Sequence, residues 1–129
     1  MADKALANKT VLVVDDDKRN IFSLTKLLES QKMSITTAHN GREALEILRA
    51  NKTFDVILMD MMMPEMDGYE TVRQLRKNKD WENLTVIALT AKVMRGEKEK
   101  CIQAGVSDYL SKPIVGEQLL SLLRVWLYK

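Results

Sequence analysis

Residues 11–16 have the sequence VLVVDD, in which four apolar residues are followed directly by two aspartates. A similar pattern recurs at residues 56–60, VILMD, and at residues 86–90, VIALT. Each apolar run has the length of a buried strand, and a core position does not tolerate an unpaired polar residue. We therefore expect the polar residues to lie where buried strands end, together at one edge of a sheet.

Segments of helical periodicity alternate with the apolar runs, which predicts a parallel α/β sheet covered on both faces. We expect strands at residues 10–14, 34–38, 56–59, 85–89 and 108–111, and helices at residues 18–31, 41–50, 69–77, 92–104 and 116–128. Asp17 is placed to cap the first helix, whose predicted apolar face includes Phe22 and Leu24. The helix at 92–104 has few apolar residues and contains Gly96, so we expect it to be the most weakly anchored.

The composition argues against several classes of partner. The chain has 129 residues and a net charge of +2, from 20 basic and 18 acidic residues, so we expect no nucleic acid partner and no membrane contact. A single cysteine and the lack of a long apolar stretch predict a cytoplasmic location. We expect one domain at residues 9–129, preceded by a flexible segment at residues 1–8.

Five polar residues follow the predicted strands: Asp15, Asp16, Asp60, Thr90 and Lys112. Ligands of an open parallel sheet bind beyond the carboxyl ends of its strands. Neighbouring carboxylates raise one another's pKa unless a cation joins them, and Mg²⁺ prefers oxygen ligands and often bridges carboxylates to a phosphoryl group. We therefore predict a Mg²⁺ site, in which Mn²⁺ can substitute, with ligands from all three aspartates and from the backbone carbonyl of Met62.

Asp60 is the predicted nucleophile, since its second oxygen is free to attack phosphorus and form an acyl phosphate. Lys112 would supply positive charge to the phosphoryl group, and Thr90 and the Ala91 N–H would supply hydrogen bonds. Met62 would flank the phosphoryl group and crowd an attacking water. Because an acyl phosphate persists only while water is poorly positioned, we expect a signal-storing domain that catalyses only its own phosphorylation and dephosphorylation.

The motifs VLVVDDD, ILMDMMMPEMDG, IALTA and YLSKP together resemble the receiver domain of bacterial two-component response regulators. The resemblance covers about residues 9–127 and implies a flavodoxin-like (CheY-like) three-layer (βα)5 fold with a five-stranded parallel sheet in the order 2-1-3-4-5. It implies Asp60 as the phosphoacceptor and Asp15 and Asp16 as metal ligands. It also implies a switch formed by Thr90 and Tyr109.

The resemblance further implies a cis peptide bond between Lys112 and Pro113, and a partner that donates phosphate from a histidine. This partner would be a histidine kinase or a histidine phosphotransfer domain. We expect it to dock on residues around the site, namely Arg19, Asn20, Ile21, Pro113 and Ile114. The stretches VDDDKRNIFSLTKLLE, MMMPEMDGYET, IALTAKVM and LLRVWL most resemble receivers at the C-terminal end of hybrid sensor histidine kinases. This favours an excised domain over a stand-alone regulator, and we expect a monomer or a weak dimer.

Three other functions fit the sequence less well. An aspartate-nucleophile phosphatase usually resembles a DxDx(T/V) pattern after the first strand, whereas Asp60 follows the third. A flavodoxin would need a Ser/Thr/Gly-rich phosphate loop where this chain has DDDKRN. A pseudo-receiver used only for binding would normally have lost part of the set of site residues, which is intact here. The consecutive methionines Met61, Met62 and Met63 are better explained by packing than by binding of a soft metal.

Overall fold

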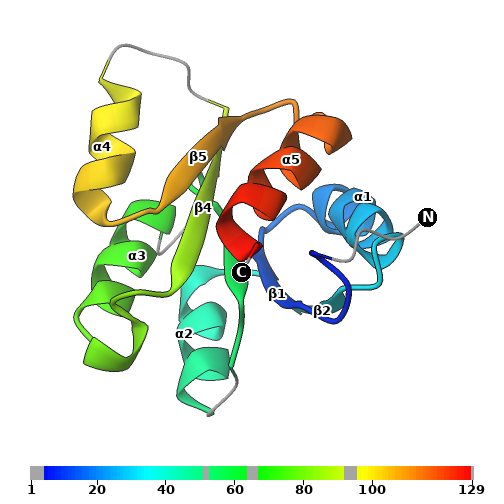
Figure 1. Cartoon of the computed structure of the whole chain (residues 1–129). Helices are drawn as coiled ribbons and strands as arrows, with labels where there is room; N and C mark the ends of the chain where they lie inside the picture. Colours follow the sequence, from blue (N-terminus) through cyan, green and yellow to red (C-terminus); the bar gives the residue numbers. More distant parts are fainter. Residues whose placement is uncertain (1–4, 51–52, 64–66, 92–95, 129) are drawn as a thin grey trace.

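The computed structural model describes residues 5–50, 53–63, 67–91 and 96–128, which form one parallel sheet flanked by helices (Figure 1). The strands are β1 (Thr10–Val14), β2 (Ser34–Ala38), β3 (Val56–Asp60), β4 (Thr85–Thr90) and β5 (Asp108–Ser111). The helices are α1 (Lys18–Glu29), α2 (Gly41–Arg49), α3 (Gly68–Arg76), α4 (Glu97–Ala104) and α5 (Gly116–Leu127), with a short 3-10 helix η1 (Lys79–Trp81). The sheet order is β2-β1-β3-β4-β5, so the predicted flavodoxin-like fold is confirmed.

Two hydrophobic cores lie on opposite faces of the sheet because successive residues of a strand point to opposite sides. One core packs α1 and α5 against Val11, Val13 and Leu58. The other packs α2, α3 and α4 against Leu12 and Ile57. The central strands are therefore buried on both sides, which explains why they are continuous apolar runs in the sequence.

Most predicted element boundaries agree with the structure to within two residues, but two local predictions are wrong. Phe22 does not belong to the apolar face of α1: its side chain is 64% exposed, with the Lys26 amine 5.4 Å from the ring centre. Gly96 is not inside a helix but is the N-cap of α4, with φ of 88°, a left-handed conformation that glycine adopts without strain. The predicted start of that helix at residue 92 lies outside the described residues.

Asp17 caps α1 as predicted, since its carboxylate accepts a hydrogen bond from the Arg19 N–H at 2.8 Å.

At the other end of the molecule, the Arg76 side chain connects α3 to neighbouring segments by hydrogen bonds. The Arg76 guanidinium donates to the carbonyl oxygens of Trp81 at 2.6 Å and Gly105 at 2.8 Å. These bonds hold η1 and the end of α4 against α3.

The segment before β1 is packed rather than separate where the structure describes it, from residue 5 onward. Leu6 is fully buried, and the Asn8 N–H donates to the Lys32 carbonyl at 2.9 Å. The division into a flexible segment 1–8 and a domain 9–129 stays a prediction. Within the described ranges, no helix is long and apolar enough to cross a membrane.

Candidate functional site

The register of the sheet brings the polar strand ends together. Asp60 pairs with Leu89 on β4, and Thr90 pairs with Ser111 on β5. Lys112 follows directly, and its backbone N–H donates to the Thr90 carbonyl at 2.8 Å. The predicted convergence of these residues at the carboxyl edge of the sheet is confirmed, although Asp60 and Thr90 are the last residues of their strands rather than the first residues of the loops.

Asp15, Asp16 and Asp60 form a compact carboxylate cluster. Each offers one oxygen, and these oxygens all lie within 4.8 Å of one another. Asp15 and Asp60 are buried, with 1% and 2% of their surface exposed, whereas Asp16 faces solvent. Three hard oxygen donors at this spacing, open to solvent on one side, fit a divalent cation that keeps several water ligands.

The start of α1 holds the Asp15 carboxylate in place. Its Oδ1 accepts the Asp17 N–H at 2.8 Å, and its Oδ2 accepts from the Asn20 side chain at 3.4 Å. Sequence reasoning assigned Asn20 to partner docking and missed this contact. The five-residue spacing from Asp15 to Asn20 suggests it only once the helix is known to begin at Lys18.

Among the described residues, Lys112 brings a positive charge to the carboxylates. Its amine lies 3.2 Å from Asp60 Oδ1 and 4.0 Å from Asp15 Oδ2. Burial raises the pKa of Asp60 above its ordinary value of 3.8, and the negative charge of Asp15 raises it further. The N–H of Met62, which donates to Asp60 Oδ1 at 3.0 Å, and the Lys112 charge act in the opposite direction. The peptide bond between Lys112 and Pro113 is cis, as predicted.

The proposed switch residues lie on the last two strands of the sheet. Thr90 is fully buried at the end of β4, and Ala91 beside it is exposed. Tyr109 on β5 is half-buried, packs against the core that contains α4, and has the Lys98 amine 6.0 Å from its ring centre. Thr90 thus ends the strand that pairs with the strand of Asp60, and Tyr109 packs against the core to which α4 contributes.

The chain after Asp60 alternates between buried and exposed side chains. Met61 and Met63 are buried in the core with α2 and α3, as packing predicts, whereas Met62 is 46% exposed. Gly68 at the start of α3 approaches this segment closely: a Cβ there would lie 2.6 Å from the Met61 Cα and 2.7 Å from the Asp60 carbonyl oxygen. The sequence marked Gly68 only as a helix boundary, and its close approach to the backbone at Asp60 became visible in the structure.

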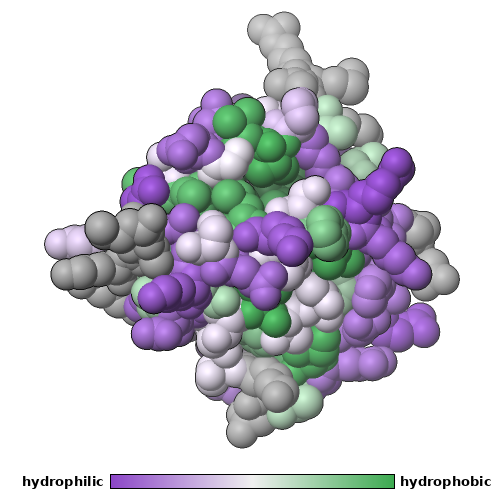
Figure 2. Space-filling view, turned by 90° about the vertical axis from the view of Figure 1, so that its right-hand side faces the viewer, coloured by the Kyte–Doolittle hydropathy of each residue, from purple (hydrophilic) through white to green (hydrophobic). Residues whose placement is uncertain are grey.

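Three of the five predicted docking residues line a pocket of about 460 Å³ next to the carboxylates. Asn20 from α1 and Pro113 and Ile114 from the segment before α5 line it, while Arg19 is almost fully exposed and Ile21 is half-buried. On the side of the molecule that carries α1, hydrophobic atoms form small patches separated by hydrophilic residues (Figure 2).

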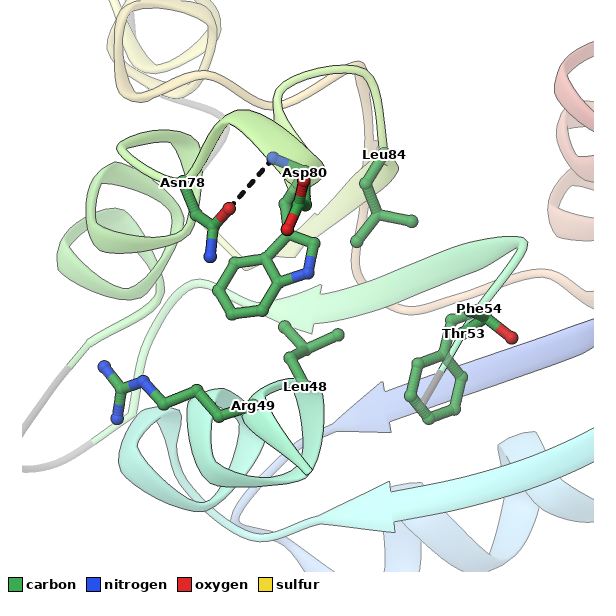
Figure 3. A pocket seen from close by; sticks show the side chains of 8 residues that line it. Leu48, Arg49, Thr53, Phe54, Asn78, Asp80 and Leu84 are labelled. Atoms are coloured by element: carbon green, nitrogen blue, oxygen red, sulfur yellow. Dashed lines mark hydrogen bonds between the residues drawn. The ribbon is translucent and has the colours of Figure 1, made fainter. Parts of the chain in front are cut away.

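A second pocket, of about 430 Å³, lies at the opposite edge of the sheet, where β3 and β4 begin (Figure 3). Side chains from the end of α2, the segment before β3, and η1 with its flanking residues line it: Leu48, Arg49, Thr53, Phe54, Asn78, Asp80, Trp81 and Leu84. None of the predicted site residues is among them, and the cluster of carboxylates is remote from it.

Comparison with known proteins agrees with this arrangement. The model of the response regulator receiver domain family matches residues 11–124. The signal transduction histidine-protein kinase BarA of Escherichia coli is 40% identical over 124 residues, which are 95% of this chain and 13% of BarA. The chain thus spans a small part of that relative.

Solved structures are similar over nearly the whole chain. The receiver domain of sensor histidine kinase PA1611 from Pseudomonas aeruginosa, solved with a magnesium ion coordinated in its active site cleft, has a TM-score of 0.87 and 32% identity over 95% of this chain and all of that one. The Vibrio cholerae chemotaxis protein CheY4 has a TM-score of 0.87 and 31% identity over 94% of this chain and all of its own.

The chain therefore belongs to the response regulator receiver domain family and is a receiver domain of two-component signalling. The acidic cluster lies at the edge of the sheet where this class of domain is expected to carry its phosphoacceptor and its metal.

Proposed function

We propose that the domain takes a phosphoryl group from a partner histidine onto Asp60 and passes on the signal through altered partner binding. The observation that carries this proposal is the setting of Asp60: a buried carboxylate, 3.2 Å from the Lys112 amine and clustered with Asp15 and Asp16. A structural ion pair would not need two further carboxylates beside it, because they repel one another.

Asp60 is the best nucleophile of the three aspartates. Both oxygens of Asp15 are engaged by donors from α1, and Asp16 is exposed. Among the described residues, the two donors to Asp60, from Met62 and Lys112, both reach Oδ1. Oδ2 receives neither hydrogen bond, so this oxygen is the candidate to bond to phosphorus.

The carboxylates of Asp15, Asp16 and Asp60, with the backbone carbonyl of Met62, would hold Mg²⁺, and Mn²⁺ has the same preference for oxygen ligands. When bound, the ion would supply positive charge that offsets the charge on the phosphoryl oxygens. The chain's own groups would orient the phosphoryl: Lys112 by its charge, and Thr90 and the Ala91 N–H by hydrogen bonds. The domain would catalyse its own phosphorylation and dephosphorylation and no other reaction.

Thr90 and Tyr109 would transmit phosphorylation to the surface. When the Thr90 hydroxyl turns toward a phosphoryl group, it leaves space into which Tyr109 can move, since the two residues lie on paired strands. The movement would reach α4, of which only Glu97, Cys101 and Ala104 are buried. Equal hydrogen-exchange protection of α4 with and without a phosphoryl mimic would contradict this switch.

The phosphate donor would be a histidine kinase or a histidine phosphotransfer domain. It would dock on Arg19, Asn20, Ile21, Pro113 and Ile114; of these, Asn20, Pro113 and Ile114 line the pocket beside the site. The identity with BarA supports a place within a hybrid histidine kinase. We further propose, from the sequence, a cytoplasmic location and a monomer or weak dimer that contacts neither membrane nor nucleic acid.

Intact-mass measurement after incubation with acetyl phosphate and Mg²⁺ tests the proposal. We expect one phosphoryl group on the wild type and on a control variant, Asp80→Asn, at the opposite edge of the sheet. We expect none on Asp60→Asn and none when a chelator is present. If neither acetyl phosphate nor a phosphorylated histidine phosphotransfer domain labels the wild type, the alternative of a binding-only domain replaces the proposal.

A further inference from the structure

The three consecutive methionines after Asp60 are held in two different environments by the backbone. The Met61 N–H donates to the Leu89 carbonyl at 3.0 Å, and the Met61 carbonyl accepts from the Gly68 N–H at 3.3 Å. These bonds fix Met61 toward the core. Met61 and Met63 are then 0% and 6% exposed, whereas Met62 between them is 46% exposed.

Met62 is exceptional among the methionines that the structure describes, since Met33 and Met59 are also at most 6% exposed. Its side chain contributes little to the core, so packing does not account for it. Its backbone N–H bonds to Asp60 Oδ1 at 3.0 Å, which anchors the residue beside the carboxylate. The residue that carries this exposed thioether is thus held beside the phosphoacceptor by its backbone.

We propose that Met62 is an oxidation site, at which a peroxide converts the thioether to a sulfoxide and thereby shortens the lifetime of the phosphoryl group on Asp60. The second part rests on the proposed function of Asp60. In the reaction the sulfur attacks one peroxide oxygen, an S–O bond forms as the O–O bond breaks, and the other oxygen leaves as water after a proton shift. The sulfur loses two electrons, and the peroxide gains them.

The effect on the phosphoryl group follows from the change in polarity. A thioether is a weak hydrogen-bond acceptor and excludes water from the flank of the site, whereas a sulfoxide oxygen accepts hydrogen bonds and holds water there. Since hydrolysis of an acyl phosphate needs a positioned water, oxidation speeds it. One added hydrogen bond to that water corresponds to a rate increase of about two- to tenfold.

Peptide mapping tests the modification independently of phosphorylation. The whole domain is treated with hydrogen peroxide in the folded state and, as a control, in urea. Fragment ions of the tryptic peptide 53–73, which holds all three consecutive methionines, then report each position. We expect Met62 to be oxidised at least about tenfold faster than Met61 or Met63 when folded, and at a similar rate in urea. Comparable rates in the folded protein would overturn the assignment.

Phosphoryl decay tests the consequence. Wild type and Met62→Leu are phosphorylated with acetyl phosphate, freed of it, and followed by intact mass with and without prior peroxide treatment. We expect peroxide to raise the decay rate about two- to tenfold in the wild type only, with reversal by methionine sulfoxide reductase. Met62→Gln should show the faster decay without peroxide.

An unchanged rate in oxidised wild type, or an equal change in Met62→Leu, would overturn the effect on lifetime and assign any change to other methionines. If the domain takes up no phosphoryl group at all, the proposed function fails together with the lifetime effect. Peptide mapping still decides whether Met62 is the oxidation site.

Discussion

Replacing Gly68 with alanine measures how closely α3 is packed against the strand that carries Asp60. The added Cβ would lie 2.6 Å from the Met61 Cα, and ordinary contacts begin at 3.4 Å, so the two segments would have to separate by about 0.8 Å. Two of the three nearest atoms are backbone, which no change of rotamer can move, and the third is the Met61 sulfur at 2.7 Å. We expect the free energy of unfolding to fall by about 1–3 kcal/mol, as for other overpacked sites.

The same displacement would affect the phosphoacceptor, because the added Cβ would also lie 2.7 Å from the backbone carbonyl oxygen of Asp60. A shift of about 1 Å at a reacting group lowers rates by up to about 10²-fold, so we expect acetyl phosphate to label Gly68→Ala at least about tenfold more slowly than wild type. Urea unfolding followed by tryptophan fluorescence gives the stability, and intact mass over time gives the labelling rate.

Gly116→Ala is the matched control for stability. Its Cβ would meet only the flexible ends of the Leu27 side chain, at 3.3 and 3.6 Å, and the residue begins a helix. We expect its free energy of unfolding to stay within about 1 kcal/mol of wild type. A Gly68→Ala protein as stable as this control, and labelled at the wild-type rate, would refute the close approach.

Three further predictions concern side chains. Arg76→Met should lower the free energy of unfolding by about 2–4 kcal/mol in urea titrations, because two carbonyl acceptors lose a charged donor, whereas Arg73→Met, an exposed position on the same helix, should change it by less than about 0.5 kcal/mol. Mg²⁺ affinity, measured by calorimetry, should fall as the pH is lowered: protonation removes a ligand, and the pKa of Asp60 is raised, so this loss begins at a higher pH than for an ordinary aspartate. A loss of affinity that begins no higher than for an ordinary aspartate would contradict the raised pKa. Lys112→Gln should slow phosphorylation about 10²-fold yet tighten Mg²⁺ binding, because the amine that offsets the carboxylates is gone; weaker binding of the metal would contradict this role.

The sheet could be predicted because strands buried on both faces must be apolar along their whole length, as residues 11–14 and 56–59 are. The ends of β3 and β4 could not be located by polarity, since Asp60 and Thr90 still pair with neighbouring strands. Phe22 matches a helical period, but only the packing of α1 on the sheet decides which residues of that period are buried. A glycine in the sequence can lie inside a helix or at its start, and the sequence pattern alone does not distinguish these two positions for Gly96. Its positive φ in the structure shows that it lies at the start of α4.

The carboxylate cluster could be predicted because parallel strands end at one edge, so residues far apart in sequence were expected together. The contacts that hold it were not predictable in the same way. The Asn20 amide reaches Asp15 because α1 begins at Lys18 and its first turn places Asn20 beside that carboxylate. The close contact of Gly68 with Met61 and Asp60 depends on where the start of α3 packs against the end of β3. Such contacts depend on the three-dimensional course of the backbone, which the pattern of residues along the sequence does not specify.

The resting site has a charge imbalance that sets an order of events. In the part of the chain that the structure describes, the carboxylates of Asp15, Asp16 and Asp60 lie beside one ammonium, that of Lys112, so these four groups when ionised carry a surplus of two negative charges. A phosphoryl donor is itself an anion, and its approach to this surplus is unfavourable in the partly buried site. A divalent cation cancels the surplus in full. Metal should therefore bind first and donor second, and the availability of the cation would decide how fast the domain can receive a signal.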